Sequence, residues 1–100
     1  MRMLIDITIP EEPFNTLVRK GTAGATIQKI MESIKPEAIY FTDQDGHRGA
    51  VMIADVKDAS AIPGIAEPFF LTFNAQCKFR IAMTAGDLAK SGIDEIAKGL

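Results

Sequence analysis

The sequence predicts an α+β domain in which helices cover one face of a four-stranded antiparallel sheet. Residues 3–9 and 77–83 alternate apolar and other residues, which is typical of strands, and two short apolar segments on either side of a turn are typical of a hairpin. Two longer segments repeat apolar residues three and four apart, which is typical of helices. Their order along the chain is βαββαβ. With 100 residues, 47% of them hydrophobic, the chain suits a single domain over residues 1–100 that buries one core.

The first strand and helix are predicted from alternation and from proline. In residues 3–9 the odd positions are all apolar, so we expect them to face the helices, with Leu4, Asp6 and Thr8 on the opposite face. Pro10 and Pro13 end the strand and suit the start of a helix. The apolar stripes of residues 14–18 and 27–34 are out of phase, and the break at Gly21–Gly24 predicts a two-piece helix.

A hairpin follows, with strands over residues 38–42 and 49–56 and a turn over residues 43–46. In the first of these strands Ile39 and Phe41 are expected to face the helices, and Tyr40 and Thr42 the opposite side. In the second, Val51 and Ile53 are expected to point inward. The remaining side chains of that strand, Ala50, Met52 and Ala54, are then expected on the uncovered face.

The second half of the chain repeats the helix and strand pattern. Apolar residues from Ile62 to Phe73 predict a helix, with Pro63 in its first turn and Pro68 at its middle. Residues 77–83 alternate again and predict the fourth strand, with Cys77, Phe79, Ile81 and Met83 on the helix side and Lys78, Arg80 and Ala82 opposite. The tail from Thr84 predicts one or two short helical turns.

The order βαββαβ is that of a ferredoxin-like fold, whose right-handed crossovers place both helices on one face of a sheet ordered 4-1-3-2. One sheet face is then left uncovered, and we call it the open face. Its predicted mixture of apolar and charged side chains is unusual for a monomer of this size. We therefore expect a homodimer that pairs through the open sheet face.

Three segments carry a resemblance to known proteins. They are KPEAIYFTDQDGHRG, IPGIAEPFFLTFNA and AMTAGDLAKSG. They resemble segments of short bacterial proteins without assigned activity in the dimeric α+β-barrel superfamily, whose ferredoxin-like subunits pair through open sheet faces. The resemblance implies a dimeric α/β barrel. It does not select an activity, because that superfamily includes monooxygenases, lactone isomerases, dehydratases and proteins with no known reaction.

The best candidate site lies on the open face. Asp6 and Arg80 are expected on neighbouring strands within reach of an ion pair, close to Lys78. As a functional site, Arg80 and Lys78 would hold a carboxylate or enolate oxygen and Asp6 would be the candidate catalytic base. As a structural feature, which is the interpretation that we favour, the same charges would fix the register of the dimer. The predicted ligand-binding residues are Thr8, Tyr40, Met52, Lys78 and Arg80.

Two other side chains that could take part in catalysis are expected to have no catalytic role. His47, the only histidine, is predicted at an exposed hairpin tip. Cys77, the only cysteine, is predicted to be a buried, unreactive thiol. One histidine and one cysteine do not make a zinc site, and Asp43 and Asp45 do not match a calcium loop, so we expect no metal and no cofactor.

Charge and hydropathy restrict the partners. Eleven Lys and Arg against thirteen Asp and Glu give a net charge of −2, which does not favour nucleic acid. The GxxG motif at Gly21–Gly24 is better explained as a helix break than as an RNA clamp. No apolar segment is long enough to cross a membrane, and no leader pattern is present, so a cytoplasmic protein is expected.

Two functions remain open from the sequence. The first is a homodimer that binds a small anionic or aromatic ligand or serves as an interaction module. The alternative is a cofactor-independent isomerase, dehydratase or monooxygenase that acts on a small aromatic or enolisable anion.

Overall fold

A computed structural model describes all 100 residues and contains one four-stranded antiparallel sheet. The strands are β1 (Arg2–Ile9), β2 (Ala38–Gln44), β3 (His47–Asp55) and β4 (Gln76–Ile81). They are hydrogen-bonded in the order β2-β3-β1-β4, which is the expected order 4-1-3-2 read from the opposite edge. The central strands, β1 and β3, therefore each have a hydrogen-bonded strand on both sides, while β2 and β4 are edge strands.

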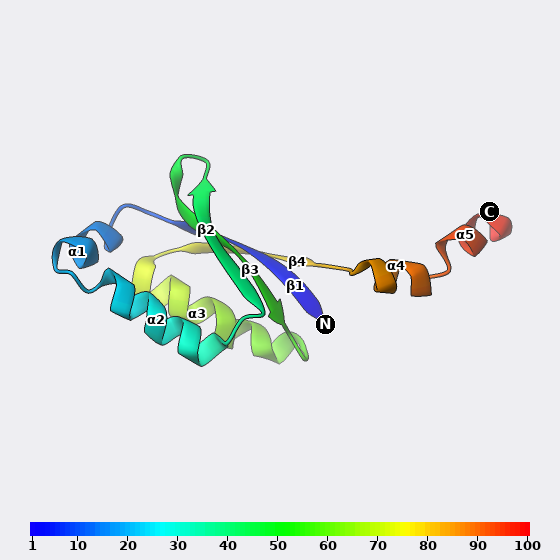
Figure 1. Cartoon of the computed structure of the whole chain (residues 1–100), viewed down its shortest axis with the longest axis horizontal. Helices are drawn as coiled ribbons and strands as arrows, with labels where there is room; N and C mark the ends of the chain where they lie inside the picture. Colours follow the sequence, from blue (N-terminus) through cyan, green and yellow to red (C-terminus); the bar gives the residue numbers. More distant parts are fainter.

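The helices that precede β4 lie together on one side of this sheet (Figure 1). The predicted two-piece helix is confirmed as α1 (Phe14–Arg19) and α2 (Ala23–Ile34), and the second helical segment is η1 (Ala59–Ala61) followed by α3 (Ile62–Phe73). Gly21 adopts a φ of +76° between α1 and α2, a conformation that suits glycine and that breaks the helix. α3 runs through Pro68 without ending there.

The core lies between the sheet and the helices. The odd-numbered residues of β1 are buried, as predicted, and they form a cluster with side chains from β3, α1, α2 and α3. The largest fully buried side chains are Phe73, Ile5, Ile7, Met52 and Val56. Alternation in β1 therefore gave the correct orientation for Asp6 as well, because its neighbours Ile5 and Ile7 are both fully buried.

The orientation predicted for β3 is wrong. Ala50, Met52 and Ala54 are buried on the helix side, while Val51 and Ile53 lie on the open face. The five residues from Ala50 to Ala54 are all apolar, so their own pattern does not show which side faces the helices. The turn contains only Asp45 and Gly46. Both have positive φ, +53° and +82°, as in the tight hairpin turns that Asp-Gly favours. Gln44 therefore pairs with His47, and this register places Met52 opposite Ile39.

Three side chains expected in the core are exposed. Phe41 lies on the helix side of β2, since it pairs with the buried Ala50, yet it is 55% exposed. Ile81 and Met83 are 66% and 65% exposed, and β4 ends at Ile81 where the prediction extended it to Met83. The reason is that the helix layer does not reach the outer part of the hairpin or the end of β4 (Figure 1).

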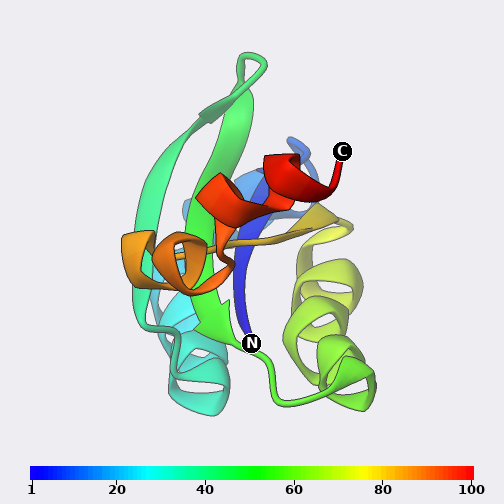
Figure 2. The same cartoon turned by 90° about the vertical axis from the view of Figure 1, so that its right-hand side faces the viewer.

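The residues after β4 leave the body of the molecule. The predicted short helical turns are α4 (Ala85–Lys90), α5 (Ile93–Ile96) and η2 (Ala97–Gly99). They extend along the long axis and away from the sheet (Figures 1 and 2). The radius of gyration is 16.8 Å, against about 13 Å for a compact domain of this length. We call residues 83–100 the arm.

None of the helices is of a length and hydropathy that would let it cross a bilayer. The longest, α2 and α3, have 12 residues each, against about 20 for a spanning helix.

Candidate functional site

The open face carries the predicted charge cluster. An Nη2 atom of Arg80 donates a hydrogen bond to Oδ2 of Asp6 over 2.8 Å, so the predicted ion pair is confirmed. The Asp6 side chain is 22% exposed and that of Arg80 is 63% exposed. The partly buried carboxylate therefore holds one end of a guanidinium whose remainder faces solvent.

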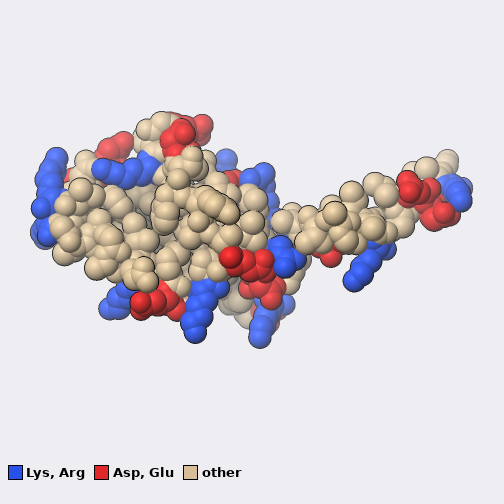
Figure 3. Space-filling view, viewed as in Figure 1, with Lys and Arg blue, Asp and Glu red and all other residues tan.

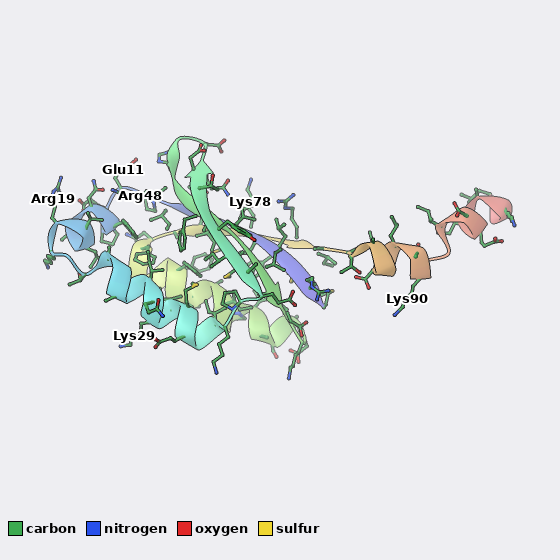
Figure 4. All side chains as sticks on the ribbon, in the orientation of Figure 1. Glu11, Arg19, Lys29, Arg48, Lys78 and Lys90 are labelled. Carbon is green, nitrogen blue, oxygen red and sulfur yellow. The ribbon has the colours of Figure 1, made fainter.

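Strand register explains this geometry. Asp6 lies directly opposite Lys78 across the β1–β4 pair, while Leu4 lies opposite Arg80. Arg80 reaches Asp6 diagonally, as long side chains on one face of an antiparallel pair do. The side chain of Lys78 points away from the helices (Figure 4) and makes no ion pair. Of the three charges in the cluster, Lys78 is the one left without a partner.

The rest of the open face is largely uncharged. On β2 and β3 it presents Tyr40 opposite Val51, and Ala38 opposite Ile53. Tyr40 is 68% exposed, which makes it one of the most exposed large hydrophobic side chains on the body. The face thus divides into a charged half, formed by β1 and β4, and an apolar half, formed by β2 and β3.

Met52 does not belong to this site. It was predicted as a ligand-binding residue, but it is fully buried in the core on the helix side of the sheet. The open-face positions of β3 are filled by Val51 and Ile53, which were missed. The Asp45–Gly46 pair was the available signal, because a two-residue turn fixes the register and with it the face of every β3 residue.

Thr8 lies at one end of the open face, beside a hollow of about 330 Å³. None of the side chains around this hollow is hydrophobic: Thr8, Pro10, Asp45, His47, Asn74 and Gln76. The largest hollow of the molecule, about 610 Å³, lies elsewhere, between α2 and α3. No hollow of the single chain is lined by Asp6, Tyr40 or Arg80. A cavity around the charge cluster would therefore need a second surface to close it.

His47 is exposed near the hairpin turn, as predicted, but it has a partner. Its Nδ1 lies 3.1 Å from Oε1 of Glu11, which follows Pro10 in the connection between β1 and α1. The pKa of Glu11 is lowered, mainly by a hydrogen bond from its own backbone N–H and to a smaller extent by the contact with His47. Neighbouring Arg48 lies over the ring of Phe14, 4.9 Å from its centre, and forms a hydrogen bond with Asn15. These contacts hold the hairpin against α1, at the end of the molecule labelled by Glu11 and Arg48 in Figure 4.

Cys77 is half-buried on the helix side of β4, where it packs against the core. Burial raises the pKa of its thiol to about 11. The predicted unreactive thiol is consistent with this environment, since a nucleophilic cysteine needs a lowered pKa. No three His, Cys, Asp or Glu side chains come together as metal ligands.

No protein-family model matches this chain, and neither does any curated protein.

Proposed function

We propose that this protein is a ferredoxin-like homodimer that holds a small anion, such as an aromatic carboxylate, between two open sheet faces. The observation that carries the proposal is the cluster of Asp6, Lys78 and Arg80 on a face that no part of the chain covers. It has one negative and two positive charges. The open face therefore combines apolar area that favours association with a surplus of positive charge.

Pairing two such faces has an electrostatic consequence. Each copy contributes one unbalanced cation, Lys78, and two of these would approach each other in a space with less water. A bound carboxylate offsets both the repulsion and the lost hydration, since hydrogen bonds between ions of opposite charge are among the strongest in proteins. Leu4, two residues from Asp6 on the same face of β1, gives the ring of such a ligand an apolar surface beside the charges. Action of Asp6 as a base on that ligand, as in the alternative of an isomerase or dehydratase, stays a prediction.

Sedimentation velocity of the wild-type chain and of Leu4→Asp tests the dimer. The wild type is expected at twice the chain mass of 10.8 kDa. Leu4→Asp is expected at the mass of one chain, because it replaces an apolar contact of the proposed interface with a carboxylate that would lose its water on association. A single-chain mass for the wild type, or an unchanged dimer in Leu4→Asp, would contradict the proposed surface.

Calorimetric titration with benzoate tests the ligand. Lys78→Ala is expected to lower the affinity at least tenfold, because it removes the unpaired cation. Lys29→Ala is the matched control, since Lys29 is an exposed lysine on α2, on the opposite side of the sheet (Figure 4). Equal affinities for wild type, Lys78→Ala and Lys29→Ala would refute the anion site and leave the dimer unaffected.

A further inference from the structure

The arm is ordered but has almost no support from its own chain. α4 and α5 have six and four residues, far below the about 12 to 15 that an isolated helix needs to persist in water. Their main contacts are with each other and with η2. A segment of this kind needs a surface to pack on.

The arm carries the apolar side chains for such a contact. Its large hydrophobic residues are all exposed, at 65% for Met83, 43% for Leu88, 53% for Ile93 and Ile96, and fully for Leu100. Ile93 and Ile96 are three residues apart in α5, which places them on one side of that helix. In the space-filling view the arm shows a largely uncharged surface between a few charged side chains (Figure 3).

The start of the arm sets its direction. Strand pairing continues to Ala82, whose N–H donates to the carbonyl oxygen of Arg2 over 3.0 Å. Two residues later Thr84 and Asp87 cap α4 reciprocally, with hydrogen bonds of 2.9 and 3.0 Å between the side chain of each and the backbone N–H of the other. Only Met83 lies between the last paired residue and this cap. That connection is too short to reverse the chain across its own open face.

We propose that the arms are exchanged between two copies of this chain, so that the apolar side of each arm packs on the β2–β3 half of the other copy's open face. That half presents Tyr40, Val51 and Ile53, and Tyr40 is on an edge strand. Its one carboxylate, Asp55, lies at the end of β3 and pairs with the N-terminal amine. Both this half and the contacting side of the arm are apolar. The charged half, around Asp6 and Lys78, is left for the contact between the two sheets. This inference rests on the proposed dimer.

The size of the interface supports the exchange. The four strands have 8, 7, 9 and 6 residues, and alternate residues give the open face about 15 side chains. A stable protein interface uses about 20 to 30 residues on each side. The open face alone falls short of that range, and about half of the 18 residues of the arm, those on its contacting side, would bring each copy to about 24. In a two-fold dimer both arms make the same contact, so the gain is doubled.

Crosslinking between two single-cysteine chains tests the exchange. In a Cys77→Ser background, one chain carries Ile93→Cys and the other carries Tyr40→Cys. The two are mixed and treated with a short bis-maleimide. A covalent product of two chains, formed in the mixture well above its level in either variant alone, is expected. Leu71→Cys replaces Tyr40→Cys as the control, because Leu71 is 80% exposed on α3, away from the open face.

Other results overturn the exchange. The exchange is refuted if the mixture crosslinks no better than the Leu71→Cys control. It is also refuted if a chain that carries both Ile93→Cys and Tyr40→Cys forms a crosslink only within itself. Sedimentation of the same mixtures separates the two proposals. A dimer without the crosslink refutes the arm contact alone, whereas single chains throughout refute the dimer as well.

A second measurement does not depend on crosslinking. The variant with Ile93→Asp and Ile96→Asp is expected to raise the dissociation constant of the dimer at least tenfold, with the circular dichroism of the sheet and long helices retained. Leu71→Asp makes the same chemical change on an exposed residue outside the proposed contact and should leave the constant unchanged. An arm variant as tightly dimeric as the Leu71→Asp control would overturn the proposal.

Discussion

At the scale of single residues, burial and charge partners separate side chains that look alike in the sequence. Met52 and Val51 are neighbours of similar hydropathy, yet Met52 is fully buried while Val51 lies on the open face opposite Tyr40. Among the cations of the open face, Arg80 is held by Asp6 and Lys78 is not. The lone thiol, Cys77, is distinguished by its partial burial, which raises its pKa.

The pKa of Cys77 predicts slow alkylation. A shift from 9.0 to about 11 lowers the thiolate fraction at pH 8 about 100-fold, because burial disfavours the charged form. Labelling by iodoacetamide at pH 8 should therefore be about 100-fold slower for the folded protein than for the chain in urea. The folded rate should still be rising between pH 10 and 11, where the unfolded rate has nearly levelled.

The same shift has a defined effect on stability. The unfolded thiol releases its proton first as the pH rises, so the contribution of Cys77 to folding is present below pH 9 and decreases from pH 9 toward 11. Stability measured over the same pH range for Cys77→Ser is the control, since it contains every other titrating group but not the thiol. Equal labelling rates for folded and unfolded protein would show that the thiol is freely accessible.

At the scale of elements, turns and breaks decide where each segment begins and which face it presents. Gly21 separates α1 from α2, and the Asp45–Gly46 turn sets the register of the hairpin. Gly49 shows how close that hairpin packs to β1, because an added Cβ would lie 2.5 Å from the carbonyl oxygen of Ile7. Within α3, Pro68 occupies the seventh of 12 positions, where it cannot donate the helical hydrogen bond to Gly64.

Pro68→Ala is expected to stabilise the protein. Alanine restores the missing donor and removes a residue that costs a helix interior up to about 3 kcal/mol, so an increase of about 1–3 kcal/mol in the free energy of unfolding is expected in urea. Pro63→Ala is the matched control, because Pro63 lies in the first turn of α3, where no such bond is lost, and its effect should be small. A decrease for Pro68→Ala would mean that packing of the proline ring against its neighbours outweighs the missing hydrogen bond.

At the scale of the whole molecule, the chain consists of a well-packed body and two surfaces left without partners. The body buries one cluster between sheet and helices. The open sheet face and the arm both expose apolar side chains, and the arm extends the molecule to 60 Å along its longest axis (Figure 1). Association of two copies would cover both surfaces at once.

Dimerisation makes the melting temperature depend on protein concentration. Because two chains separate on unfolding, each tenfold increase in concentration should raise Tm by about 3–5 °C for a domain of this size. Differential scanning calorimetry at three concentrations measures the slope. Leu4→Asp should melt at a lower temperature that does not change with concentration. A wild-type Tm that is independent of concentration would contradict the dimer.

The sequence by itself determined the order of the elements, the two-piece helix and the face on which Asp6, Thr8, Lys78 and Arg80 lie. It could do so because β1 and β4 alternate cleanly between apolar and polar residues, and because glycine and proline mark the breaks. β3 was different, since Ala50–Ala54 are all apolar and their periodicity does not distinguish one face from the other. Its orientation, and with it the place of Met52, follows from hydrogen bonding to β1 and β2.

Tertiary structure alone decided which apolar residues are covered. Phe41, Ile81 and Met83 are large apolar residues of the kind that is usually buried, and local pattern gives no measure of how far a helix layer extends over a sheet. Coverage depends on the lengths and positions of elements that are distant in the sequence. For the same reason the contact of Glu11 with His47, between residues 36 positions apart, could not be read from either segment.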